Sequence, residues 1–79
     1  MPPILREGPY RFYFVSADRD EPPHVHVRRD EGFAKFWLSP EVVLQTSGNF
    51  GRAEVRRIQA IVESNQALFL RRWDVYFNR

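Results

Sequence analysis

The spacing of apolar residues changes once along this chain, and that change limits the fold more than any other feature. After the break "SGNFG" at residues 47–51, apolar residues recur at the 3.6-residue period of an α-helix. We therefore predict a helix from about Arg52 to Phe77, either continuous or bent near Ser64 and Asn65. Its apolar positions are Val55, Ile58, Ile61, Val62, Leu68, Phe69, Trp73, Tyr76 and Phe77.

Before the break, the pattern is that of strands. "HVHVRR" at residues 24–29 alternates polar and apolar side chains with a period of two. "YRFYFVS" (10–16) and "FAKFWLS" (33–39) also predict strands, and "RDEG" (29–32) supplies a glycine for a hairpin. "EVVLQT" (41–46) fits a short fourth strand or a helical turn.

Strands followed by a helix predict an α+β fold, with a three- to four-stranded antiparallel sheet and one long C-terminal helix packed on one face. A chain of 79 residues buries too little surface for two cores. We expect a single domain over residues 1–79, with the sheet in 4–46 and the helix in 52–77. There is no cysteine, and residues 1–14 lack the pattern of a signal peptide, so we expect a cytoplasmic protein.

The net charge of +2 is too small to indicate a nucleic-acid-binding protein by itself, but positive charge is concentrated in the C-terminal part. Residues 51–79 contain six Arg against three acidic residues. Eleven of the twelve basic residues are Arg, the type suited to bidentate contact with phosphate. One hypothesis is therefore a DNA-binding regulator that contacts phosphates through the helix edge at Arg52, Arg56 and Arg57.

Strand pleating predicts which side chains share the face of the sheet that the helix leaves open. If Val25 and Val27 face the helix, then His24, His26 and Arg28 face away from it. Applied to the other strands, the same alternation puts Tyr10, Phe12, Phe14, Ala34, Phe36 and Leu38 inside. The open face is then basic and aromatic, and it holds Arg11, Tyr13, His24, His26, Arg28, Phe33, Lys35 and Trp37.

Such a surface is typical of two kinds of binding. Contiguous exposed aromatic residues mark protein interfaces, and the partner-binding candidates are Tyr13, Phe33 and Trp37. Aromatic and Arg planes also stack on RNA bases while basic residues contact phosphates. The nucleic-acid-binding candidates are Arg11, Arg28, Lys35 and Trp37 on the sheet, with Arg56 and Arg57 on the helix.

The two histidines of "EPPHVHV" (21–27) also suggest chemistry. In a metal-independent endoribonuclease, His24 and His26 would act as the acid/base pair, and Arg28 and Lys35 would hold the phosphate. A metal site needs three or four ligands, and further ligands would have to be carboxylates such as Glu7, Asp20 or Glu21. Two histidines alone are an incomplete site, so we expect no metal and no other cofactor.

Three sequence stretches in this order resemble one family. E-P-P-H-x-H-V at residues 21–27, A-K-F-W-L at 34–38 and E-x-x-x-I at 54–58 are similar to the bacterial domain-of-unknown-function family DUF4160. Its members are small stand-alone proteins, often encoded beside another small uncharacterised domain. That gene pairing implies a toxin–antitoxin system. Gly51 departs from the Ser or Thr helix cap expected ahead of Glu54.

We therefore expect a component of a toxin–antitoxin-like pair that acts by binding a partner protein and, as a further expectation, RNA. The partner would be a small protein encoded by a neighbouring gene, and no membrane is involved. The endoribonuclease and the DNA-binding regulator are the alternatives. The sequence leaves open whether the chain is the toxin, the antitoxin or neither, and whether it forms a homo-oligomer.

Overall fold

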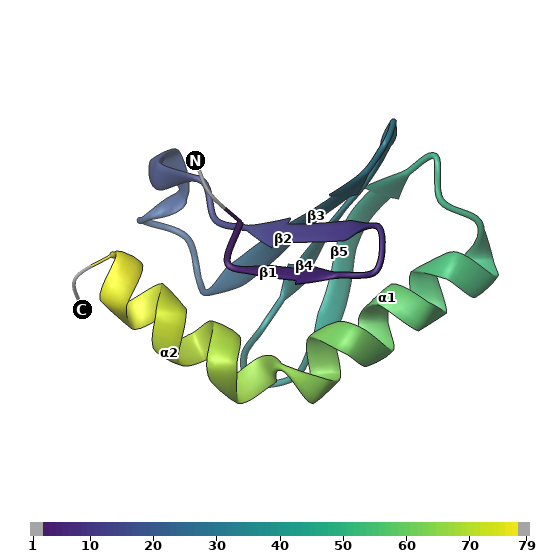
Figure 1. Cartoon of the computed structure of the whole chain (residues 1–79). Coiled ribbons are helices and arrows are strands. Elements are labelled where there is room, and N and C mark those ends of the chain that lie inside the picture. The colour runs from purple at the N-terminus through teal and green to yellow at the C-terminus, as the bar shows by residue number, and fades with distance from the viewer. Residues whose placement is uncertain (1–2, 78–79) are drawn as a thin grey trace.

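The computed structural model describes residues 3–77 and has an α+β architecture of two layers (Figure 1). One layer is a five-stranded antiparallel sheet in which each strand pairs with its neighbours in sequence, in the order β1-β2-β3-β4-β5. The other layer is formed by two C-terminal helices. The elements are β1 (Leu5–Glu7), β2 (Tyr10–Tyr13), the 3-10 turn η1 (Ser16–Asp18), β3 (His24–Arg29), β4 (Gly32–Trp37), β5 (Val43–Gly48), α1 (Arg52–Ser64) and α2 (Gln66–Tyr76).

The sheet has five strands where the sequence predicted three to four. Strand β1 was missed because its three residues are too few to show alternation; it pairs with β2 through a hairpin in which Gly8 has a φ of 56°. The segment left open between strand and helical turn is a strand, Val43–Gly48. The predicted strand 10–16 ends at Tyr13, because the chain then turns into η1.

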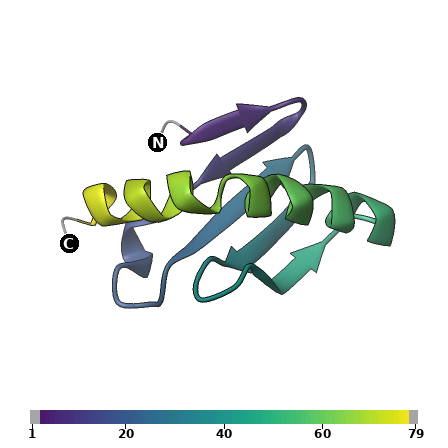
Figure 2. The same cartoon turned by 90° about the horizontal axis from the view of Figure 1, so that it is seen from below.

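The expected single helix is two helices that meet at Asn65, the place where a bend was the alternative. Asn65 has φ −112° and ψ 14°, outside the helical range, and its side-chain amide donates to the Ile61 carbonyl at 2.8 Å. An asparagine that bonds the backbone in this way competes with regular helix geometry. The bend lets α1 and α2 together cross one face of the sheet (Figure 2).

The core lies between the helices and the inner face of the sheet, and the predicted alternation of this face is confirmed. Every residue assigned to it is buried, including Val25 and Val27, which have no exposed surface. From the helices, the buried residues are Ile58, Val62, Phe69, Trp73 and Phe77, five of the nine predicted apolar positions. No helix among residues 3–77 is long and apolar enough to cross a membrane.

The strand register arranges the outer face of the sheet in three rows of directly opposed residues. The first row contains the three arginines Arg6, Arg11 and Arg28, followed by Phe33 and Gly48. The second contains Tyr13, His26, Lys35 and Thr46. The third contains His24, Trp37 and Val43. The outer face therefore has a basic side at β1–β3 and an apolar side at β4–β5.

Candidate functional site

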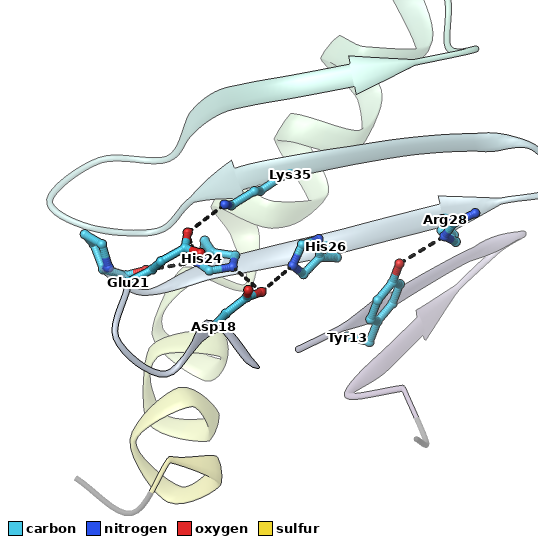
Figure 3. Close-up of polar contacts among 8 residues, drawn as sticks. Tyr13, Asp18, Glu21, His24, His26, Arg28 and Lys35 are labelled. Atoms are coloured by element: carbon cyan, nitrogen blue, oxygen red, sulfur yellow. Dashed lines mark hydrogen bonds and ion pairs between the residues drawn. The ribbon is translucent and has the colours of Figure 1, made fainter. Parts of the chain in front are cut away.

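A single carboxylate oxygen joins the two histidines of β3 (Figure 3). Asp18 Oδ2 lies 2.8 Å from Nε2 of His24 and 2.8 Å from Nε2 of His26. Asp18 is placed there by η1, in which the Asp18 amide donates to the Val15 carbonyl at 3.0 Å. After β2, the chain thus turns back over the outer face and brings an acidic side chain onto β3.

His24 lies on the outer face, as the alternation predicted, but the expectation that its side chain is exposed there is wrong. Its side chain has no exposed surface, although it shares the outer row with Trp37. The η1 loop covers it from one side, and Trp73 of α2 lies 5.1 Å away between ring centroids. Its Nδ1 donates to the Pro22 carbonyl at 2.9 Å. In this arrangement the ring cannot touch a polymeric substrate.

His26 is the accessible member of the pair, with 22% of its side chain exposed. Its ring stacks on Tyr13, with centroids 5.4 Å apart and planes 17° from parallel. Burial lowers the pKa of His26, and the hydrogen bond to Asp18, which raises it, does not compensate. His26 is therefore neutral at pH 7.

The carboxyl group of Asp18 is ionised in the same environment. Burial raises the pKa of Asp18, but its close contacts with His26 and His24 and the charges that these rings carry when protonated together outweigh burial and place it below its ordinary value. An ionised carboxylate thus faces a neutral His26 and the buried His24.

Lys35 lies beside the histidines but is already engaged. It is opposite His26 in the register, and its Nζ donates to Glu21 Oε1 at 2.7 Å. The same ammonium lies 4.8 Å from the ring centroid of Trp37, within cation–π range. Lys35 was expected to contact phosphate, and it would first have to leave Glu21.

The basic side of the outer face is formed by Arg6, Arg11 and Arg28, which are all exposed. Arg28 Nε donates to the Tyr13 hydroxyl at 3.1 Å, and none of the three forms an ion pair with residues 3–77. Arg11 and Arg28 flank a hollow of about 370 Å³ that is also lined by Tyr13, Phe14, Val15 and Ser16. Like charges directly opposite one another destabilise a sheet, so this row favours an anion.

The apolar side holds two exposed hydrophobic residues. Phe33 is 39% exposed and Val43 is 49% exposed, with the half-buried Trp37 on the strand between β3 and β5. A Cβ added at Gly48 would lie 2.3 Å from the Phe33 ring, so this ring rests directly on the Gly48 backbone. The predicted partner-binding residues Phe33 and Trp37 thus lie on one side of the face, and Tyr13 lies on the basic side.

The predicted helix-edge arginines lie elsewhere. Arg52, Arg56 and Arg57 are exposed on α1, in the layer that covers the inner face of the sheet. They belong to α1, whereas Arg11, Arg28 and the histidines belong to strands of the sheet.

Three residues at this face were not predicted from the sequence to lie there. Arg6 was missed because β1 was not predicted, and Val43 because its segment was left undecided. Asp18 was missed because its position depends on the course of a loop. Of the carboxylates considered in its place, Asp20 is exposed and Glu7 ends β1. Glu21 does lie near the pair, with Oε1 4.0 Å from His24 Nδ1, but it also bonds Lys35, and Asp18 is the group at the Nε2 atoms. The sequence feature that could have pointed to Asp18 is the short turn "SAD" directly after a strand.

Comparison with known proteins gives a family but no characterised relative. A family model described as "Domain of unknown function (DUF4160)" matches residues 10–74, and the chain therefore belongs to this family. The match includes both histidines, Asp18, and most of the sheet and helices. No curated protein and no solved structure matches the chain.

Proposed function

We propose that this member of the DUF4160 family is one component of a toxin–antitoxin-like pair, and that it acts by binding RNA and a partner protein through the outer face of its sheet. The observation that carries the proposal is the row of Arg6, Arg11 and Arg28, three exposed arginines on adjacent strands without acidic partners among residues 3–77. The toxin–antitoxin part rests on the gene pairing that is typical of the family.

RNA fits the basic side of this face. Three guanidinium groups in a row match a phosphate backbone, and Arg forms bidentate contacts with phosphate. Tyr13 lines the hollow beside Arg11 and Arg28, and one face of its ring stacks on His26; an unpaired base would stack on the other face. A structural role for this row is poorly supported, because the mutual repulsion of three arginines weakens the sheet.

A partner protein fits the apolar side. Phe33 and Val43 are exposed on the same face, and β5 is an edge strand of six residues with one free side. Exposed aromatic side chains near an unpaired strand edge are typical of protein interfaces and of strand addition. The two sides of the face would thus hold the two ligands next to each other.

The RNA part is tested by two double variants that remove the same charge from different layers. Arg11→Gln with Arg28→Gln changes the sheet, and Arg56→Gln with Arg57→Gln changes α1. Binding to a single-stranded RNA is measured as a function of salt. We expect the sheet variant to reduce the slope of log K against log salt by roughly 1.4, about 0.7 for each lost phosphate contact. The α1 variant should keep the wild-type slope.

The opposite result would move the function to the helix. If the α1 variant alone loses its salt slope on duplex DNA, then the DNA-binding alternative replaces the RNA proposal. A wild-type protein that binds RNA with no salt dependence would remove the arginine row from the proposal.

The endoribonuclease alternative has less support. His24 was to be half of its acid/base pair, but the ring has no exposed surface and is enclosed by Trp37, Trp73 and the η1 loop. General acid/base work requires the group to lie within hydrogen-bond reach of the substrate. RNA that stays intact after long incubation with the wild-type protein would agree with a binding function.

A further inference from the structure

We propose that Asp18, His24 and His26 bind a divalent transition metal ion of the zinc class on the outer face of the sheet. The three ligand atoms lie within 4.8 Å of one another and come from the start of β3 and from η1. This site does not depend on RNA or on a partner protein.

The contacts of His24 determine which of its two ring nitrogens carries the proton. Nδ1 lies 2.9 Å from the Pro22 carbonyl oxygen. A carbonyl oxygen can only accept a hydrogen bond, so Nδ1 carries the proton and donates it. In the neutral ring, Nε2 then has a lone pair, and this lone pair points at Asp18 Oδ2 only 2.8 Å away. Two lone-pair atoms at that distance require something positive between or beside them.

A proton could meet this requirement only at a cost. Because Nδ1 already carries one proton, a second proton on Nε2 would make the ring an imidazolium. A full positive charge would then lie on a side chain with no exposed surface. Its carboxylate partners would be Asp18, which also serves His26, and Glu21, whose Oε1 lies 4.0 Å from Nδ1 and already accepts from Lys35. Buried charges are tolerated when they are well paired, but their desolvation is costly. A divalent cation instead accepts a lone pair from each of the three groups.

The ligand set is one that transition metals use. Two imidazoles and one carboxylate make up the protein ligand set of some catalytic zinc sites and of the facial triad of non-haem iron. Metal–ligand bonds of about 2.0–2.2 Å place the ligand atoms of a tetrahedral site about 3.4 Å apart. Relative to the 2.8 Å contacts, Asp18 would therefore move away from the rings by roughly half an ångström, and the two ring nitrogens, which lie within 4.8 Å of each other, would come to about 3.4 Å. Asp18 is on a loop that can make this adjustment.

The surroundings also match those of a metal site. Ligating histidines usually donate their second nitrogen to a carbonyl or carboxylate, and the Pro22 carbonyl has this role for His24. The proline pair at residues 22–23 stiffens that segment. Glu21 neutralises Lys35, which is the nearest cation on the register row of His26. His26 and Asp18 are 22% and 16% exposed, which leaves room for a water molecule as a fourth ligand.

The test uses the full chain after metal removal by a chelator and dialysis. Zn²⁺ is titrated by calorimetry, and Co²⁺ is titrated by its visible absorption, which responds to nitrogen and oxygen ligation. We expect one ion per chain for the wild type. Asp18→Asn and His26→Gln should each weaken binding by about tenfold or more. Asp20→Asn removes the same charge from an exposed residue two positions away and should bind like the wild type.

Folding of each variant is checked by its near-UV circular dichroism, and a measurement on the wild type needs no variant. Zn²⁺ should shift the ring ¹H–¹⁵N resonances of His24 and His26 and should raise the melting temperature through its binding free energy. Absence of these effects in the folded wild-type chain would overturn the proposal, as would equal affinities of Asp18→Asn and Asp20→Asn. RNA binding by Asp18→Asn is measured separately, so failure of the metal site and failure of the RNA proposal can be told apart.

Discussion

The imidazole of His24 and the indole of Trp73 pack against each other with ring centroids 5.1 Å apart, although one begins β3 and the other belongs to α2. Neither residue has exposed surface. Trp73 also contacts Phe14 and Phe77, at 5.2 Å and 4.2 Å. The second helix thus forms one wall of the histidine site. A substitution that disturbs its packing should lower the free energy of unfolding and also change the histidine site.

We expect Trp73→Ala to lower the free energy of unfolding by about 3–5 kcal/mol, because it leaves a large cavity in the core. The loss is a large fraction of the stability of a small domain. Trp73→Phe should cost less, since the buried indole N–H has no hydrogen-bond partner among residues 3–77 to lose. Urea denaturation measures both. Val75→Ala, on a 79% exposed neighbour, is the control and should change little.

Glu54 connects α1 to the sheet and should make stability depend on pH. Its carboxylate accepts two hydrogen bonds from Arg29, at 2.7 and 2.8 Å, and one from the Tyr10 hydroxyl at 2.8 Å. The hydrogen bonds from Arg29 and then from Tyr10 lower the pKa of Glu54 below its ordinary value. A carboxyl group whose pKa is depressed by folding stabilises the protein above its unfolded-state pKa, and this contribution is lost as pH falls through the folded-state pKa.

Glu54→Gln should therefore destabilise the protein at pH 7 and have a smaller effect at an acidic pH below the depressed pKa of the wild-type carboxyl group. Unfolding free energies at the two pH values test this. Glu63→Gln, on the exposed side of the same helix, should change stability little at either pH. An effect of Glu54→Gln that is equal at both pH values would show that its charge is not what stabilises the contact.

Gly32 is a position where the sheet accepts no side chain. A Cβ at this residue would lie 2.2 Å from the Phe50 ring, which in turn packs edge-on against Tyr10 at 6.3 Å. We expect Gly32→Ala to cost about 1–3 kcal/mol, because Phe50 must move out of its site. Gly51→Ser is the contrasting change, since a Cβ there meets nothing within 4 Å and a hydroxyl would cap α1. It should raise the melting temperature slightly.

Much of this fold could be predicted because two backbone periods determine it. The period of two placed Val25 and Val27 in the core and His26 and Arg28 outside, and the 3.6-residue period identified the buried side of the helices. Elements of only a few residues could not be predicted from these periods. The three residues of β1 contain less than two alternations, and the bend near Ser64 and Asn65 was predicted only as an alternative to a continuous helix.

The candidate site was only half predictable for a related reason. Alternation correctly put His24 and His26 on one face of a strand, because that depends on β3 alone. The burial of His24 and the approach of Asp18 depend on a loop that folds back and on Trp73 from a helix some fifty residues later. Such tertiary contacts leave no periodic pattern in the sequence, so Asp18 was not among the carboxylates named as further ligands.

The exposed phenyl ring of Phe33 gives a last prediction, which tests the partner-binding side of the face. Phe33→Ser should raise the dissociation constant for the small protein encoded by the neighbouring gene by roughly tenfold or more, because a partner that docks on this face would bury the 39% exposed phenyl ring. Calorimetric titration of the purified pair measures this. Val75→Ser removes an even more exposed apolar side chain from the helical layer and should leave the constant unchanged. Similar losses for both variants would show that the partner does not distinguish the sheet face from the helices, and would exclude the outer face as its docking surface.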